Sequence, residues 1–212
     1  MKFEEFLKSI SKIENIQLPA ETSHFKMVPP YRHELLKKQQ KAIKKAKHAG
    51  VLALFYPDKK EETKIILILR NTYKGVHSAQ VAFPGGKFED QDETLQDTAL
   101  RETFEEVGVP VNTIQIVKKI SQVYIPPSNF YVQPFIGVTQ NTPQFVKQDE
   151  EVEALIEVDL EHFLDNQSLI TKSVKTSYSV EVEVPAFKLN NYVVWGATAM
   201  MLSEIKDLLK QL

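Results

Sequence analysis

Three glutamates lie close together in a short segment, Glu102, Glu105 and Glu106. At about 100° per residue of a helix, they occupy one arc of about 100°. The apolar residues expected on the opposite side are Leu100, Phe104 and Val107. Because like charges at this spacing repel one another, a purely structural helix would gain nothing from the glutamates. Hard divalent cations such as Mg²⁺ take oxygen ligands and would relieve the repulsion while leaving sites for substrate phosphates.

A glycine-rich turn precedes the glutamates. Six residues separate Gly86 from Glu93, and seven more separate Glu93 from Arg101. This spacing resembles the Nudix box, the signature of hydrolases that cleave diphosphates linked to another group. Relative to the usual box, the chain has one extra residue after Gly86 and has Thr103 in place of an aliphatic residue, while the rest from Glu93 to Val109 matches.

The lengthened box is similar to that of the coenzyme A pyrophosphatase branch of the Nudix family. That branch carries a further motif just upstream, and residues 66–71 and 77–86 of this chain contain much of it. Gly75 stands where a basic residue is common, and Ala79 stands where glycine is common. The upstream motif is therefore only partly kept.

The resemblance implies a site that holds Mg²⁺ or Mn²⁺. The implied metal ligands are Glu102, Glu105, Glu106 and the carbonyl group of Gly85. A glycine at position 85 would also let the backbone come close to the ion and the phosphate. Arg101 would orient the site, and in the family it pairs with the first glutamate of the box, here Glu93.

A further carboxylate is expected from the acidic segment 149–153, where Glu151-Val152 resembles a Glu-Val pair of the coenzyme A branch. Glu151 is predicted to be a metal ligand or the base that takes a proton from the attacking water, and a solvated acidic turn is the alternative. The general base stays open between Glu102 and Glu151. The expected catalytic residues are thus Arg101, Glu102, Glu105 and Glu151.

Substrate binding is predicted for Arg70, His77, Gly85 and Gly86. Arg70 ends an apolar strand, and its guanidinium suits bidentate phosphate contacts, with a structural salt bridge as the alternative. His77 could touch the phosphates or could be a surface histidine of a loop.

By resemblance, the chain is expected to hydrolyse coenzyme A or an acyl derivative to 4′-phosphopantetheine and adenosine 3′,5′-bisphosphate. Another diphosphate, such as ADP-ribose, a nucleotide sugar or a nucleoside triphosphate, is the first alternative. The second is a Nudix module that binds a ligand without cleaving it. The complete set formed by Arg101 and the three box glutamates argues against the second alternative.

Composition limits the remaining possibilities. The 212 residues carry a net charge of −2 and contain no cysteine. This balance does not favour nucleic acid or an anionic membrane as the partner, and no apolar run approaches the roughly 20 residues of a membrane span. Disulfides and a cysteine nucleophile are excluded. We expect a cytoplasmic protein whose partner is a small nucleotide diphosphate.

The patterning predicts a helix over residues 2–14, a linker over 19–30, and a second helix with a lysine face over 33–48. Strands are expected at 51–56 and 65–69 as a hairpin, then at 114–123, 131–138, 152–158, 178–189 and 192–195. Helices are expected over the box, at 160–164 and at 197–210.

This order of elements predicts an α+β fold in which helices sandwich a mixed sheet. The resemblance implies the same Nudix-type α/β/α sandwich. We divide the chain into an N-terminal helical extension with its linker, residues 1–30, and a single domain, residues 31–212. The extension could cover the active site, form a homodimer contact or cap the core.

Overall fold

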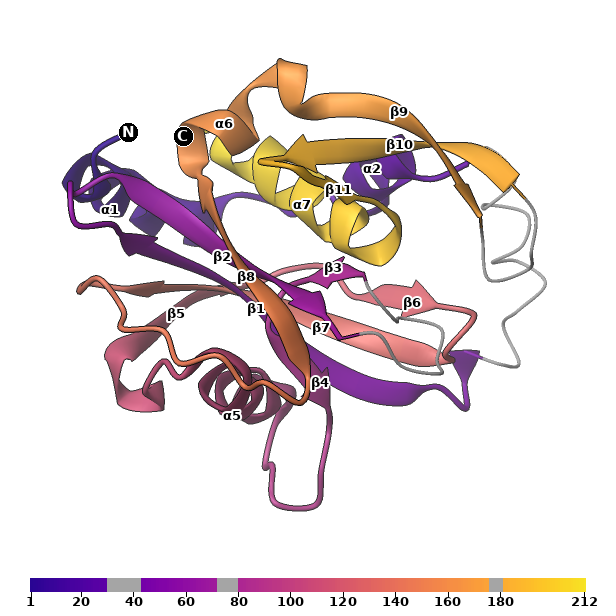
Figure 1. The fold of residues 1–212 in the computed structure, drawn as a ribbon, viewed down its shortest axis with the longest axis horizontal. Helices are drawn as coiled ribbons and strands as arrows, with labels where there is room; N and C mark the ends of the chain where they lie inside the picture. The colour runs from indigo at the N-terminus through magenta and orange to yellow at the C-terminus, as the bar shows by residue number, and fades with distance from the viewer. Residues whose placement is uncertain (30–42, 72–79, 176–180) are drawn as a thin grey trace.

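The computed structural model of the protein describes residues 1–29, 43–71, 80–175 and 181–212 (Figure 1). Its helices are α1 (Phe3–Ile10), α2 (Glu21–His24), α5 (Leu95–Val107), α6 (Leu160–Leu164) and α7 (Gly196–Leu209), with the 3₁₀ helices η1 (Ser11–Asn15), η2 (Phe25–Met27), η3 (Val111–Thr113) and η4 (Asn166–Ser168). Its strands are β1 (Lys47–Pro57), β2 (Thr63–Arg70), β3 (Val81–Ala82), β4 (Gly85–Lys87), β5 (Ile114–Lys119), β6 (Val123–Ile125), β7 (Phe130–Thr139), β8 (Val152–Asp159), β9 (Leu169–Lys175), β10 (Glu181–Leu189) and β11 (Tyr192–Val194).

Strand β1 is the centre of a mixed sheet with the order β3-β2-β1-β7-β5. It pairs with β7 in parallel and with β2 and β4 antiparallel. Strands β6 and β8 extend the sheet by pairing with β7 and β2. Strands β9, β10 and β11 form a second, antiparallel sheet.

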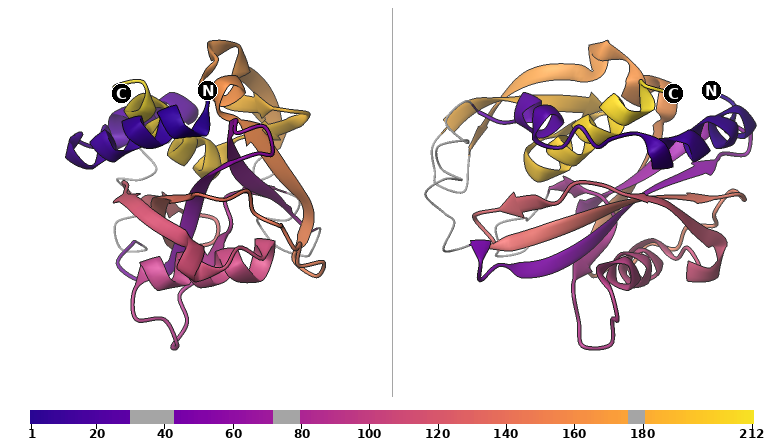
Figure 2. Two further views of the ribbon diagram at one scale, coloured as in Figure 1. Left: turned by 90° about the vertical axis from the view of Figure 1, so that its left-hand side faces the viewer. Right: turned by 180° about the vertical axis from the view of Figure 1, so that it is seen from behind.

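The large sheet lies between two layers. Helix α5 covers one face, and α7, the small sheet and the N-terminal helices cover the other (Figures 1 and 2). Because successive side chains of a strand point to opposite faces, β2 supplies both cores. Its Ile66 and Ile68 pack on the α5 side, whereas Ile65 and Leu67 pack on the α7 side. The predicted α/β/α sandwich with a mixed sheet is confirmed.

Most of the predicted elements are present, with several differences, among them the short strands β3 and β4, which were not predicted. The strand expected at 114–123 is split into β5 and β6, and the linker expected at 19–30 contains α2 and η2. Strand β9 was not predicted, because its residues Thr171, Lys172 and Ser173 lack an apolar alternation. The lysine-rich helix predicted over 33–48 cannot reach its expected end, since Lys47 and His48 belong to β1, and residues 30–42 lie outside the described part.

The N-terminal segment is integrated into the core on the α7 side of the sheet. Phe3, Phe6, Ile10 and Ile13 are buried in the same apolar cluster as the α7 residues. This is the spacing that predicted the helix. The segment lies across the sheet from α5 (Figure 2), so of the three roles considered for it, capping the core fits its position.

A buried carboxylate joins this segment to the rest of the domain. Glu204 of α7 is fully buried and accepts hydrogen bonds from the Ala20 amide at 3.2 Å and from the Ser121 hydroxyl at 2.6 Å. His24 Nε2 lies 2.9 Å from its other oxygen. Although burial alone would raise it, the pKa of Glu204 is lowered by the hydrogen bonds with His24 and Ser121.

Replacement of Glu204 by alanine is expected to lower the free energy of unfolding by about 3 kcal/mol, because its buried donors lose their acceptor. Urea unfolding at neutral pH measures the effect. The matched control is Glu14→Ala, which removes an exposed carboxylate and should change stability by no more than about 0.5 kcal/mol. Equal losses in the two variants would contradict the anchoring role.

Candidate active site

Helix α5 has well-defined ends that set its register on the sheet. Its N-cap Thr94 accepts a hydrogen bond from the Asp97 amide at 3.2 Å, and the Asp97 carboxylate accepts one from the Thr94 amide at 2.8 Å. This is a reciprocal capping box. Gly108 ends the helix with φ +77°, a left-handed conformation that glycine adopts without strain.

The helix lies against the sheet backbone at glycines. A Cβ atom at Gly50 of β1 would stand 2.1 Å from the Leu95 carbonyl oxygen of α5, and one at Gly86 of β4 would stand 2.3 Å from the Glu102 carboxylate carbon. Only glycine fits at position 50, where the clash is with backbone, whereas at position 86 a side chain would have to displace the Glu102 carboxylate. The close approach brings the box carboxylates directly onto the backbone of the glycine-rich turn.

Glu106 is the most deeply buried of the three box glutamates, with 1% of its surface exposed. Its carboxylate accepts hydrogen bonds from the Gly85 amide at 2.8 Å and from Arg70 Nη1 at 3.1 Å. Burial raises the pKa of Glu106 to about 7, although Arg70 and the Gly85 amide act in the opposite direction. Because burial disfavours the charged form of this carboxylate, a further cation beside it would stabilise that form.

Arg101 is held by Asp92 and not by Glu93. Its Nε and Nη2 donate to the two oxygens of Asp92 at 2.9 and 3.0 Å, a bidentate pair, whereas Glu93 is exposed. The predicted Glu93–Arg101 pair is therefore wrong. The reason is local: Glu93 precedes the N-cap and points outward, while Asp92 is turned inward and also accepts from the Thr98 hydroxyl at 2.9 Å. The hydrogen bonds from Arg101 lower the pKa of Asp92 to about 2.

Fixed in this way, Arg101 reaches the other two box glutamates. Its Nη1 donates to Glu102 Oε1 and to Glu105 Oε2, both at 3.0 Å. Glu102 is largely buried, and burial raises its pKa, whereas the side chain of Glu105 is 49% exposed. The orienting role predicted for Arg101 fits this geometry.

The buried face of α5 agrees with the predicted one only in part. Leu100 and Val107 are buried as predicted, but Thr103 is fully buried too, and its hydroxyl donates to the Ala99 carbonyl at 2.6 Å. Phe104, expected on the core side, is 52% exposed. The helix is rotated relative to the prediction because Glu106 is buried against Gly85, and a helical wheel cannot show that a carboxylate belongs to the core face.

Arg70 comes from strand β2 and points to the α5 side, as Ile66 and Ile68 do. The register with β8 shifts at this point: Leu69 lies opposite Ala154 and Arg70 opposite Val152, so the extra residue is on β8. Its guanidinium donates to the Gly85 carbonyl at 3.3 Å and to Glu106, and it lies 3.7 Å from Glu151 Oε2. The sequence interpretations of Arg70 included such a salt bridge as the alternative to substrate binding.

Glu151 reaches the site from a distant loop. The Asn71 side-chain amide donates to the carbonyl groups of Asp149 and Glu150, both at 2.9 Å, and the Asn71 amide donates to the Glu151 carbonyl at 2.8 Å. Glu151 also raises the pKa of Glu102 and Glu106 by charge repulsion. The structure thus brings Glu151 to the box glutamates. Asn71 was missed as the residue that positions it, although it ends the matching motif.

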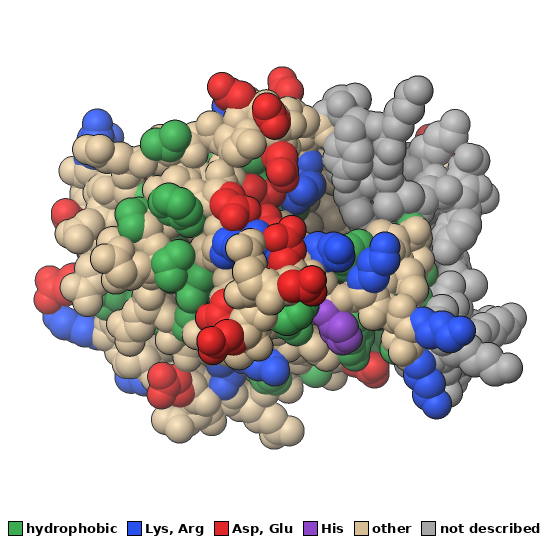
Figure 3. All heavy atoms as spheres, turned by 90° about the horizontal axis from the view of Figure 1, so that it is seen from below, with side chains coloured by type: hydrophobic (Ala, Val, Ile, Leu, Met, Phe, Trp, Pro, Cys, Tyr) green, Lys and Arg blue, Asp and Glu red, His purple; other side chains and the backbone are tan. Residues whose placement is uncertain are grey.

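The donors at the site fit a hard divalent cation. They are oxygens only, and five carboxylates face two guanidinium groups: Asp92, Glu102, Glu105, Glu106 and Glu151 against Arg70 and Arg101. Figure 3 shows acidic and basic side chains gathered on this side of the molecule. Among residues 1–29, 43–71, 80–175 and 181–212, however, no three acidic or histidine side chains converge as a ready-made ligand group. His77 lies outside the described residues.

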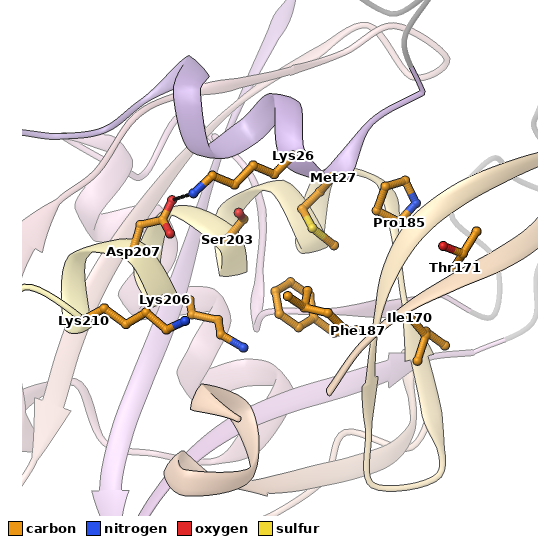
Figure 4. Close-up of a pocket in the computed structure, with 11 residues that line it drawn as sticks. Lys26, Met27, Ile170, Thr171, Pro185, Phe187, Ser203, Lys206, Asp207 and Lys210 are labelled. Atoms are coloured by element: carbon orange, nitrogen blue, oxygen red, sulfur yellow. Dashed lines mark hydrogen bonds and ion pairs between the residues drawn. The ribbon is translucent and has the colours of Figure 1, made fainter. Parts of the chain in front are cut away.

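A pocket of about 390 Å³ lies elsewhere, between α7, the β9–β10 pair and η2 (Figure 4). Its lysines are engaged. Lys26 pairs with Asp207 at 2.6 Å, and Lys206 donates to the Phe163 and Asp165 carbonyl groups at 3.1 and 2.7 Å. The pocket is on the α7 side of the sheet, so it is not part of the carboxylate site.

Comparison with known proteins defines the family. A profile described as the NUDIX domain matches residues 46–176, more than half of the chain. The chain therefore belongs to the Nudix family. It is 32% identical over 155 residues to the peroxisomal coenzyme A diphosphatase ndx-8 of Caenorhabditis elegans, a match that covers 72% of this chain and 64% of that protein, less than two thirds of its length.

A second relative is an uncharacterized Nudix hydrolase, NudL of Yersinia pestis. It is 30% identical over 144 residues, which are 68% of this chain and 71% of that protein. Among solved structures, the Nudix hydrolase RenU of M. smegmatis superposes with a TM-score of 0.54 at 15% identity, over 79% of this chain and 88% of that one. A MutT/nudix family protein of Enterococcus faecalis gives 0.50 at 18% identity, over 84% and 68%. These likenesses support the fold.

Asp92→Asn is expected to lower the free energy of unfolding by about 2 kcal/mol at neutral pH, because Arg101 loses its charged partner. Since the pKa of Asp92 is about 2, below its ordinary 3.8, its contribution is present above the ordinary value and is lost as the pH falls toward 2. Urea unfolding across this range should show wild type and variant converging in acid. Asp90→Asn, at an exposed position, is the control, and a pH-independent difference would contradict the assignment.

Proposed function

We propose that the protein hydrolyses the diphosphate bond of coenzyme A or an acyl derivative, with Mg²⁺ or Mn²⁺, to 4′-phosphopantetheine and adenosine 3′,5′-bisphosphate. The observation that carries the hydrolytic part is the convergence of Glu102, Glu105, Glu106 and Glu151 with two arginines on the backbone of a glycine-rich turn. The choice of coenzyme A is supported by the name of the nematode relative and by the partly kept upstream motif.

Glu102, Glu105, Glu106 and the Gly85 carbonyl are the groups we assign to the cation. When bound, a divalent ion screens the phosphate charge and makes a water molecule more acidic. Gly86 has no side chain, which leaves room for the Glu102 carboxylate beside the backbone of the turn. Arg70 and Arg101 supply the positive charges that orient a diphosphate, and Arg70 is the more accessible of the two, with 23% of its side chain exposed against 17%.

We assign the general base to Glu151. Glu102, the other candidate, is already bound to Arg101 at 3.0 Å and lies on Gly86, so its carboxylate is enclosed. Glu151 is 54% exposed in its side chain and is held by its backbone through Asn71, so its carboxylate stays open to water. A base of this kind needs a position within hydrogen-bond reach of the attacking water.

The partner in this proposal is a small nucleotide diphosphate, and the net charge of −2 supports that choice over nucleic acid. Among the described residues, no helix has the length and apolar character needed to span a membrane. The homodimer contact and the cytoplasmic location expected from the sequence stay predictions; the nematode relative is named as peroxisomal.

Incubation with coenzyme A, ADP-ribose, a nucleotide sugar and nucleoside triphosphates, followed by mass spectrometry, tests the function. We expect 4′-phosphopantetheine from coenzyme A with Mg²⁺ and none without it. Glu105→Gln should lower turnover by roughly 100-fold without unfolding the protein, because the Glu105 side chain is 49% exposed.

Other results would revise the proposal in separate ways. Metal-dependent cleavage of another compound in the panel would keep the chemistry and replace the substrate. If the folded protein cleaves none of these compounds, the result contradicts the hydrolytic function and favours the alternative of a non-catalytic binding module.

Glu151→Gln is expected to reduce kcat by roughly 100-fold or more while KM changes little, since a base acts in the transition state. Glu153→Gln, an exposed carboxylate on the same segment, is the matched control. An unchanged kcat in Glu151→Gln would contradict the assignment and leave Glu102 as the base.

A further inference from the structure

Both arginines at the site are bound to oxygens that a metal ion would use. Arg101 binds Glu102 and Glu105, and Arg70 binds Glu106 and the Gly85 carbonyl. This arrangement explains why the carboxylates do not form a ready-made ligand group among the described residues. Glu102 and Glu105 bind Arg101, whereas Glu106 binds Arg70, so the three carboxylates do not share one centre.

The two arginines are not held equally. Arg101 makes two short hydrogen bonds to buried Asp92, at 2.9 and 3.0 Å, which do not involve the box glutamates. It can therefore keep its place when Glu102 and Glu105 are taken by another partner. Arg70 has no such anchor among the side-chain contacts that the structure describes: its guanidinium contacts are Glu106 at 3.1 Å, the Gly85 carbonyl at 3.3 Å and Glu151 at 3.7 Å.

We propose that Arg70 is a removable place-holder for the divalent cation. In the metal-free protein its guanidinium neutralises Glu106 and occupies the Gly85 carbonyl; when the cation binds these oxygens, Arg70 leaves them and turns to the substrate's diphosphate. The proposal deepens the proposed function and rests on its metal requirement. It makes Arg70 a residue that competes with the metal first and binds the phosphates afterwards.

Electrostatics and position favour this exchange. A guanidinium and a divalent cation on the same buried carboxylate repel each other strongly where the effective dielectric constant is low. With neither Arg70 nor a metal ion beside it, the buried Glu106 carboxylate would keep the Gly85 amide as the one partner of its side chain among the described residues. A buried charge with so few partners is costly. Arg70 lies at the end of β2, and 23% of its side chain is exposed, so part of it is already open to solvent. Guanidinium groups bind phosphate oxygens in bidentate fashion.

Arginine side-chain NMR on the wild-type protein tests the exchange directly. The chain has only three arginines, Arg32, Arg70 and Arg101, so Arg70→Lys and Arg32→Lys variants assign the signals. With Mg²⁺ and no substrate, we expect the Arg70 Nε and Nη signals to shift and its guanidinium rotation to become faster. The Arg101 guanidinium should remain restricted by Asp92. The backbone amide signals of Gly85 and Gly86 report arrival of the metal.

A binding measurement gives a second test. In calorimetric titrations, Arg70→Gln should bind Mg²⁺ about fivefold more tightly than wild type, and Arg70→Lys, which keeps the charge, should not. Lys8→Gln, which removes an exposed positive charge from α1, controls for net charge. The affinity for coenzyme A in the presence of Ca²⁺ should change in the opposite direction and fall in Arg70→Gln.

The outcomes separate this inference from the proposed function. If Mg²⁺ shifts the glycine amides and supports hydrolysis while the Arg70 signals stay unchanged, the place-holder role is wrong and the function stands. Unchanged or weaker Mg²⁺ binding by folded Arg70→Gln also overturns it. If Mg²⁺ neither shifts the glycine amides nor supports hydrolysis, both the metal-dependent function and the place-holder role of Arg70 are wrong.

Discussion

Helix α5 lies so close to strand β1 that one methyl group would not fit between them at Gly50, and its Glu102 carboxylate fills the space over Gly86 of β4. The rest of the site depends on this contact. It places the Glu106 carboxylate on the Gly85 amide and the Glu102 carboxylate over Gly86. It also fixes which face of the helix is buried, because a carboxylate that bonds to the sheet backbone must lie on the core side.

The closely packed carboxylates repel one another, and two arginines offset this repulsion. The two arginines differ in how they are held. The pair between Arg101 and Asp92 is bidentate, and it holds Arg101 beside Glu102 and Glu105. Arg70 instead binds the Glu106 carboxylate and the Gly85 carbonyl, which are oxygens that a metal ion would also use. The raised pKa of Glu106, about 7, shows that even Arg70 does not fully compensate its burial. Burial of these carboxylates therefore favours a further positive charge beside them.

The other side of the sheet supplies rigidity. The N-terminal helices, α7 and the connection between β5 and β6 meet at Glu204, whose hydrogen bonds link segments more than 180 residues apart, as between Ala20 and Glu204. Strands β1 and β2 are buried on both faces and contribute to both cores. The site is therefore built on strands that cannot shift without disturbing the α7 layer.

The order of elements and the types of residue at the site follow from the chain's own sequence, because apolar periodicity and the glycine–glutamate–arginine spacing are local properties. From these came the sandwich, helix α5, Arg70, Arg101 and the three box glutamates. Local patterns could not show that Asp92 rather than Glu93 holds Arg101, that Phe104 is exposed, or that Lys47 starts a strand. Nor could they bring Glu151 to Glu106 through Asn71. Those features depend on which groups meet across the fold, where burial and hydrogen bonding between distant segments outweigh the preference of each segment alone.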